Sequence, residues 1–154
     1  YKRQVLAAAD LLEEDFGVIA DVWSVTSFSE LRRDGLDAQR WNMFHPESKP
    51  RRAYVTECLD EHGGPVIAST DYIKLQADQI RAFVPGAYHV LGTDGYGRSD
   101  MRANLRRFFE VDRYHVVLAT LKALADQGEI DATKATEAIK KYAIDPERPN
   151  PSTL

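Results

Sequence analysis

The organisation of this chain is clearest in the segment Val90-Leu91-Gly92-Thr93-Asp94-Gly95-Tyr96-Gly97-Arg98-Ser99-Asp100, which has the form of a strand, a glycine-rich loop and the start of a helix. The three glycines of this loop allow backbone conformations that a Cβ would forbid and allow another chain or a ligand to approach closely. Ser99 or Asp100 is placed to cap a helix that begins near Met101. Since ligands and partners of open α/β sheets usually sit beyond the carboxyl ends of the strands, the loop is a candidate site.

Length and composition indicate one globular domain with a real core. The chain has 154 residues, of which 44% are hydrophobic and 29% are charged. The net charge of -4 argues against nucleic-acid or anionic-membrane partners, and no apolar run approaches the roughly 20 residues that span a bilayer. The single cysteine, Cys58, cannot form an internal disulfide, which favours a reducing, cytoplasmic location.

Alternating helical and strand patterns predict an α/β fold in three α/β/α layers around a mostly parallel sheet. We expect buried strands at residues 18–25, 65–70 and 88–91, and an irregular segment at 34–50. Helices without a predicted cap are expected at 2–16, 51–61 and near 101–108. Four more helices are expected to begin at a capping residue: at Ser27, with Glu30 at capping-box spacing, at Thr70 or Asp71 and running through Val84, at Asp112, and at Asp131. We predict one domain over residues 1–144 and an extended tail over 145–154.

The expected sheet is small. Three strands are fewer than the usual five or six, and the first helix has no strand before it. The chain also opens on Tyr1 rather than on methionine. We therefore expect that the domain lacks its first strand or strands and that unpaired strand edges are exposed.

Two interpretations of the glycine loop compete. With Arg98 and Arg102 nearby it resembles a phosphate cradle, but its spacing is neither the dinucleotide fingerprint nor the Walker pattern. The carboxylate of Asp94 would also repel phosphate. A packing or interface loop, in which the glycines serve close approach, is the favoured interpretation.

The remaining chemistry-bearing residues form no catalytic set. The histidines have no metal-ligand spacing with one another or with Cys58. We interpret Cys58 as a small core residue. Trp23, within an expected strand, is most simply a core residue, whereas Trp41 in the irregular segment is a candidate contact residue. We therefore assign no catalytic, cofactor-binding or metal-binding residue to this chain.

Four motifs resemble the carboxyl-terminal domain of the homodimeric bacterial pyruvate dehydrogenases, the first component of the pyruvate dehydrogenase complex. The glycine loop is also similar, more distantly, to the Gly-x-Asp-x-Phe-Gly-x-Ser segment of transketolases, with Tyr96 in the aromatic position. The motifs, in chain order, are Ala20-Asp21-Val22-Trp23-Ser24-Val25-Thr26-Ser27-Phe28, then Arg40-Trp41-Asn42-Met43 with His45-Pro46, then Ala68-Ser69-Thr70-Asp71-Tyr72, and Leu91 to Asp100.

The resemblance implies a parent enzyme that uses thiamine diphosphate and Mg²⁺ to decarboxylate pyruvate. Such an enzyme passes the two-carbon unit to a lipoyl group on the dihydrolipoyl acetyltransferase. The resemblance also implies that the matched region is a transketolase C-terminal-like third domain, which helps to hold the dimer and carries none of the cofactor motifs. Members of the family have a strand ending in Gly-Ser-Gly before the first helix, and this chain begins after it.

Our hypothesis is a third domain that is noncatalytic by itself and that contacts the remaining domains and the second subunit of the same enzyme. Two alternatives stay open: a free-standing interaction module that docks a partner through Trp41 and residues 34–50, and a small anion-binding regulatory domain that uses Arg98. The candidate interface residues are Thr26, Ser27, Phe28, Trp41, Asp94, Gly95, Tyr96, Gly97, Arg98 and Ser99.

Overall fold

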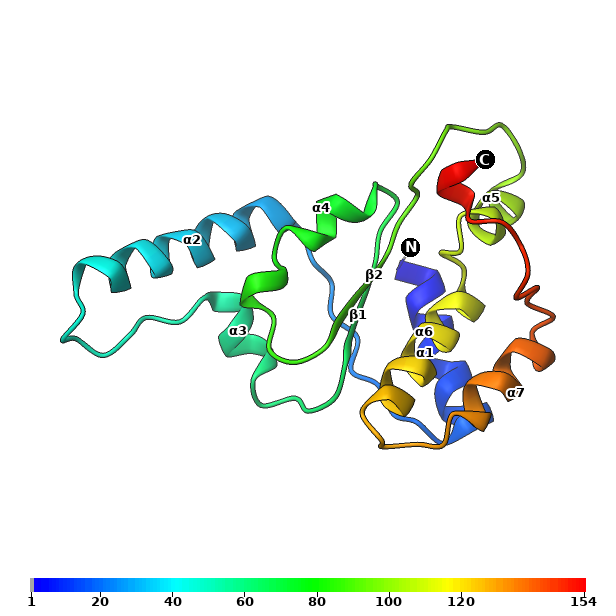
Figure 1. Ribbon diagram of the computed structural model, residues 1–154, viewed down its shortest axis with the longest axis horizontal. Helices are drawn as coiled ribbons and strands as arrows, with labels where there is room; N and C mark the ends of the chain where they lie inside the picture. The colour runs from blue at the N-terminus through cyan, green and yellow to red at the C-terminus, as the bar shows by residue number, and fades with distance from the viewer. Residues whose placement is uncertain (1) are drawn as a thin grey trace.

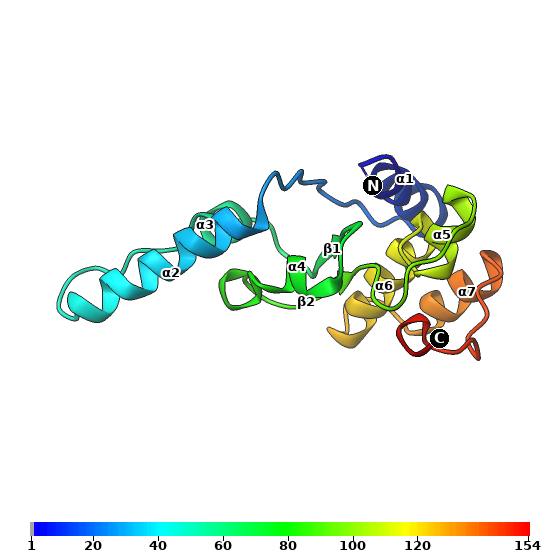
Figure 2. The same ribbon diagram turned by 90° about the horizontal axis from the view of Figure 1, so that it is seen from above.

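The computed structural model describes residues 2–154, and their side chains from residue 3 onward. Helices lie on both sides of a small central sheet, and one long helix extends away from the body (Figures 1 and 2). The elements are α1 (Lys2–Phe16), α2 (Phe28–Phe44), α3 (Tyr54–Leu59), β1 (Val66–Ser69), α4 (Lys74–Asp78), the 3₁₀ turn η1 (Arg81–Phe83), β2 (Tyr88–Leu91), α5 (Arg102–Phe108), α6 (Arg113–Asp126), α7 (Thr133–Lys141) and the 3₁₀ turn η2 (Pro151–Thr153).

The two strands of the sheet are parallel and are joined by a crossover through α4 and η1. Val66 pairs with Tyr88, and this register runs through to the pairing of Ser69 with Leu91. A parallel pair needs such a crossover because the chain must return to the same end of the sheet. The expected α/β class with a parallel sheet is confirmed, although within residues 2–154 the sheet has only two strands.

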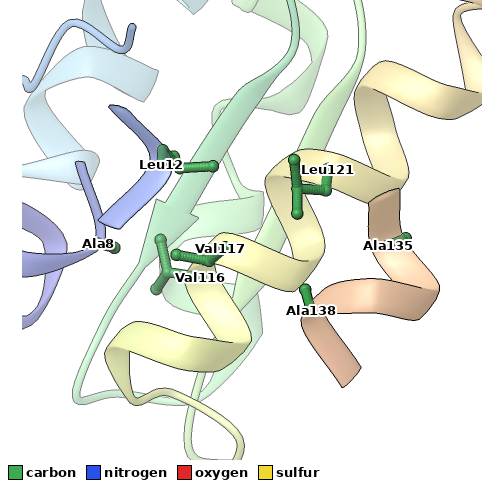
Figure 3. Close-up of a cluster of buried hydrophobic side chains, with 7 residues drawn as sticks. All are labelled: Ala8, Leu12, Val116, Val117, Leu121, Ala135 and Ala138. Carbon is green, nitrogen blue, oxygen red and sulfur yellow. The ribbon is translucent and has the colours of Figure 1, made fainter. Parts of the chain in front are cut away.

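Alternate residues of the strands face different helix layers, as the pleat of a β-strand requires. Ile67 and Leu91 pack against a cluster formed by α1, α6 and α7 (Figure 3). Val66 and Val90 pack against a second cluster, built around α3, η1 and the start of β2. The buried members of the first cluster are Ala8, Leu12, Val116, Val117, Leu121, Ala135 and Ala138, and those of the second are Ala53, Val55, Ile80, Phe83, Val84 and Tyr88.

Tyr88 anchors the second cluster to the crossover. Its hydroxyl donates to the carbonyl of Ala77 at 2.9 Å, and burial raises the pKa of Tyr88 to about 12. Gly35, in the middle of α2, lies against the ring of Phe83, where a Cβ would come within 2.7 Å of ring carbons. This close contact explains why a glycine stands inside a helix, where it ordinarily costs stability.

The expected strand at residues 18–25 does not form. This segment makes no ladder hydrogen bonds to β1 or β2 in the described chain, and Ile19 and Trp23 are 83% and 51% exposed. His62 holds the segment near the loop before β1, because its Nδ1 lies 2.8 Å from a carboxylate oxygen of Asp21 and its ring meets Trp23 edge-on. The apolar run favoured a strand, but within the described chain the backbone of this segment pairs with neither outer edge of the two-stranded sheet. Trp23 is therefore not the core residue that the sequence suggested.

Three further expectations about local structure were wrong. Residues 34–44 are helical rather than irregular. Helix α2 continues to Phe44, and His45 is its C-cap residue. The helix expected through Val84 is only α4 followed by η1, and it has Ile73 rather than Thr70 or Asp71 at its N-cap. The tail over 145–154 is not extended throughout, since η2 forms there and Pro151 is buried. The caps expected at Ser27 and Asp112 are confirmed. Ala132 holds the N-cap position of α7, but the expected capping contact of Asp131 also forms, since its carboxylate accepts a hydrogen bond of 2.8 Å from the backbone N–H of Thr133. Within the described chain, every helix is too short or too polar to cross a bilayer.

Asp112 fixes the start of α6, the helix that covers the sheet. Its carboxylate accepts hydrogen bonds from the backbone N–H groups of Tyr114 and His115, and it lies 2.7 Å from the Nδ1 of His115. Burial alone would raise the pKa of this carboxyl group, but the hydrogen bonds from His115 and the charge of Arg107 lower it below its ordinary value. The folded state therefore favours the ionised cap.

We expect Asp112→Ala to lower the free energy of unfolding at pH 7 by about 2 kcal/mol, because α6 loses its cap and a charged hydrogen bond. Folding lowers the pKa of Asp112, so its ionised carboxylate stabilises the folded state fully above about pH 4, the ordinary pKa of the group. This stabilisation is lost as the pH falls through the lower pKa that Asp112 has in the folded state. Urea unfolding at pH 7 and pH 3 measures both effects. The exposed Asp10→Ala is the matched control. A loss no larger than the control at pH 7 would contradict the assignment.

Candidate functional site

The glycine loop, residues 92–100, leaves the carboxyl end of β2 as the sequence predicted. Its first half is fixed to the turn that precedes α4. The backbone N–H of Thr93 donates to the carbonyl of Tyr72 at 2.9 Å, and its hydroxyl donates to the carbonyl of Asp71 at 2.6 Å. Gly92 is buried at this contact, where a Cβ would lie 2.7 Å from the backbone nitrogen of Lys74. Glycine at 92 is therefore explained by close backbone packing within this chain.

Asp94 turns away from the open side of the loop. Its Oδ1 accepts a hydrogen bond of 2.9 Å from the backbone N–H of Lys74, and its Oδ2 lies 4.0 Å from the Nζ of the same lysine. The carboxylate thus ties the loop to the start of α4 and meets a positive charge there. The structure gives Asp94 a positioning contact that the sequence did not reveal.

The middle of the loop touches the C-terminal end of the chain. Gly95 has a φ of +108°, and a Cβ at this residue would lie 2.7 Å from the carbonyl oxygen of Pro151. Figure 1 shows η2, at the C-terminus, beside the segment that follows β2. Residues far apart in the sequence therefore hold the loop on two sides.

The second half of the loop is open. Tyr96 is 83% exposed, and a Cβ on Gly97 would meet no atom within 4 Å. The guanidinium of Arg98 lies 4.1 Å from the ring centroid of Phe108, on α5. Asp100 accepts from the side chain of Asn104 at 2.8 Å and from the N–H of Met101, and these hydrogen bonds lower its pKa. The N-cap of α5 is Met101, so neither Ser99 nor Asp100 is the cap residue that the sequence predicted.

Trp41 lies near the far end of α2, away from the glycine loop (Figures 1 and 2). Its ring stacks on His45 at 4.1 Å between centroids, and the guanidinium of Arg51 lies 4.2 Å from the centroid of the tryptophan ring. Met43 and Phe44 are 68% and 60% exposed beside it. We call these five residues the aromatic tip. It is a layered, partly apolar surface at the end of a projecting helix.

The third predicted group, Thr26 to Phe28, forms the start of α2. The side chain of Ser27 accepts from the N–H of Glu30 at 3.2 Å, while Phe28 packs against the second core cluster. Figure 1 shows α4 between this turn and the glycine loop. The structure therefore distributes the predicted interface residues over three places rather than one.

The exposure of the apolar side chains in residues 18–25 was not predicted from the sequence, because this apolar run was interpreted as a buried strand. It also missed Met43 and Phe44, since the segment beyond Asp34 was expected to be irregular. A helical pattern that continues to Phe44 would have placed them on α2. Among the described residues, no group of three or more His, Cys, Asp or Glu side chains is arranged to hold a metal ion.

Comparisons with known proteins identify relatives of this chain. Residues 3–112 match the model of the family described as the transketolase-like TK C-terminal domain. The pyruvate dehydrogenase E1 component of Pseudomonas aeruginosa is 63% identical over 150 residues, which are 97% of this chain and 17% of that protein. The same component of Cupriavidus necator is 58% identical over 152 residues, and that of Escherichia coli K12 is 53% identical over 150 residues. These two matches cover 99% and 97% of this chain and 17% of each relative, so the chain spans 17% of the length of these curated relatives.

We expect Gly95→Ala to destabilise the protein by about 2 kcal/mol or more, because alanine disfavours the positive φ and its Cβ would collide with the carbonyl of Pro151. Gly97→Ala is the matched control, since its Cβ would point into open space, and its effect should stay within about 0.5 kcal/mol. Urea unfolding of both variants measures the difference. Equal losses would show that the C-terminal turn does not hold the loop in solution.

Proposed function

Because the chain belongs to the transketolase-like TK C-terminal domain family, we propose that it is the third domain of a pyruvate dehydrogenase E1 component, with a structural and subunit-interface role. The observation that carries the proposal is the match with the relatives. The alignment covers 97% of this chain at 63% identity but only 17% of the Pseudomonas aeruginosa protein. A free-standing interaction module does not explain why nearly every residue aligns with one part of a longer enzyme.

We further propose that the whole enzyme decarboxylates pyruvate with thiamine diphosphate and Mg²⁺, in the cytoplasm, and transfers the two-carbon unit to a lipoyl group of the dihydrolipoyl acetyltransferase. We assign no residue of this chain to the Mg²⁺ of that cofactor. The open side of the glycine loop carries arginines, which repel Mg²⁺, and no group of carboxylates in the described residues is arranged for that ion. No catalytic step is therefore assigned to a residue of this chain.

The surfaces that meet the rest of the enzyme are proposed from exposure. Ile19, Val22, Trp23 and Val25 expose apolar side chains along one segment, and the aromatic tip exposes others. Exposed apolar side chains that gather in this way are typical of surfaces that another protein surface covers. The glycine loop, with Tyr96 exposed and Gly97 open, is the third such surface. The covering partners in this proposal are the other domains and the second subunit of the same enzyme.

The purified chain alone should not convert pyruvate to acetaldehyde or reduce a lipoyl acceptor when thiamine diphosphate and Mg²⁺ are supplied. The physical reason is that, among its described residues, no group of three or more His, Cys, Asp or Glu side chains is arranged to hold Mg²⁺. A coupled assay for pyruvate decarboxylation measures this, with the Pseudomonas aeruginosa E1 component as the positive control. Turnover, or thiamine diphosphate binding that requires Mg²⁺, would contradict the proposal.

A chimaera tests the role in the whole enzyme. The 150 aligned residues of this chain should replace the matching 17% of the Pseudomonas aeruginosa E1 component and leave its pyruvate decarboxylation within about tenfold of the parent, since 63% of the aligned residues are already the same. The control chimaera carries the aligned segment of the Escherichia coli protein, which is 53% identical to this chain. If that control is active and the chimaera with this chain is a folded but inactive dimer, the proposal fails.

Trp41→Ala, made in the isolated chain and in the same chimaera, tests whether the aromatic tip lies at an interface with the rest of the enzyme. In the isolated chain the substitution removes stacking on two exposed side chains, His45 and Arg51, and should have little effect on stability. In the chimaera it should lower Tm or promote subunit dissociation, because a covered aromatic residue is lost. An equal change in Tm in the isolated chain and in the chimaera would show that the aromatic tip is not part of the interface.

A further inference from the structure

Residues 145–154 follow α7 and return to the glycine loop (Figure 1). The base of this segment is fixed to α5, because Nη2 of Arg107 donates to the carbonyl of Tyr142 at 2.9 Å and to that of Ala143 at 2.6 Å. Beyond this base the chain runs to η2, which lies beside the segment that follows β2. We call residues 145–154 the strap.

The strap meets the middle of the glycine loop at Pro151. This proline is buried, and a Cβ on Gly95 would lie 2.7 Å from its carbonyl oxygen and 3.2 Å from the Cα of Ser152. No space for a side chain therefore remains between the strap and the loop at Gly95. While the strap stays in this position, it limits the conformations that the backbone of Gly95 can adopt.

The strap and the loop meet a second time on the ring of Phe108, in α5. The guanidinium of Arg98, from the loop, lies 4.1 Å from the ring centroid, and that of Arg148, from the strap, lies 4.9 Å from it. Both distances are within the roughly 6 Å over which a cation is attracted to an aromatic ring. Arg148 also donates from Nη1 to the carbonyl of Arg107 at 3.2 Å. One ring therefore contacts both segments, so a shift of either changes the surroundings of the other.

Few other contacts hold the strap. Of the described residues 145–154, Pro151 is the one that is buried. The hydrogen bonds of Asn150 with Ser152 and Thr153 stay within the strap and do not bind it to the rest of the domain. A segment with so little buried surface opens at a lower free energy than the whole domain needs to unfold. The strap is therefore suited to local release.

The hollow around Phe108 supports the same view. Arg98, Phe108 and Arg148 line a space of about 270 Å³. Ring contacts, rather than dense packing, thus join the loop and the strap to α5. Release of the strap at this place does not require the disruption of a packed core.

The first half of the glycine loop is held independently of the strap. The backbone N–H of Thr93 donates to the carbonyl of Tyr72, and Asp94 accepts from the N–H of Lys74. Both partners belong to the segment that leads into α4 and starts it. Release of the strap would leave these contacts in place and would affect the half of the loop that begins at Gly95.

We propose that the strap controls the conformation of the open half of the glycine loop. When the strap is docked, residues 95–98 are presented in one arrangement. When it is released, these residues lose their contacts with the strap and sample several conformations. The coupling is reciprocal, because a change that frees the loop weakens docking of the strap by the same free energy. The inference goes beyond the structural role proposed above, since every contact in it lies within this chain.

Limited proteolysis of the purified chain with chymotrypsin measures release, because Tyr96 lies in the controlled half of the loop and cleavage needs a mobile backbone. Arg148→Ala removes a ring contact and a hydrogen bond of the strap, and should raise the rate of cleavage after Tyr96 about tenfold. Arg102→Ala, which removes an exposed arginine of α5, is the matched control and should change the rate by less than about twofold. Equal rates for the unchanged chain and Arg148→Ala would overturn the proposal.

Nuclear magnetic resonance tests the reverse direction of the coupling. Arg98→Ala alters the loop alone, yet it should lower the backbone order parameters of Ser152 and Thr153 from about 0.85, typical of a rigid backbone, to below about 0.6. Arg98→Lys keeps a cation near the ring and should retain most of the order in the strap. Unchanged order parameters in the strap of Arg98→Ala would overturn the proposal.

The amide of Thr93 distinguishes local release from general loosening. Its hydrogen bond to Tyr72 does not involve the strap, so its protection from hydrogen exchange should be the same in Arg98→Ala, in Arg148→Ala and in the unchanged chain. If Thr93 loses protection in step with the strap, the whole domain responds to the substitutions, and the proposal fails.

Discussion

The pleat of two short parallel strands is the constraint on which the rest of this structure depends. Because successive side chains of β1 and β2 point to opposite faces, the sheet must be covered by helices on both. Ile67 and Leu91 join one apolar cluster, while Val66 and Val90 join the other. The three layers follow from this alternation, and the sheet separates the two clusters.

The same geometry places the glycine loop. The loop begins where β2 ends, so its position is fixed relative to the turn after β1, which lies at the same edge of the sheet. Hydrogen bonds from Thr93 and to Asp94 secure its first half, and the contact of Gly95 with Pro151 secures its middle. What remains open is the half that carries Gly97 and Arg98. A rigidly held loop with one free side is suited to contact something outside the fold.

Exposed apolar surface connects the fold to the proposed role. The segment around Trp23 and the aromatic tip at the end of α2 present side chains that a domain within a larger enzyme would cover. The match of the chain with 17% of each E1 relative agrees with that view.

Local chemistry determined much from the sequence alone. The caps at Ser27 and Asp112, the helix stop at Gly17 with its φ of +67°, the strands around residues 67 and 89, and the family motifs were all readable, because each depends on neighbours in the chain. Tertiary structure alone decided that residues 18–25 stay unpaired, that Gly35 packs on Phe83, and that Asp94 turns toward Lys74. Each of these depends on a partner distant in the sequence, and periodicity carries no information about which distant groups will meet.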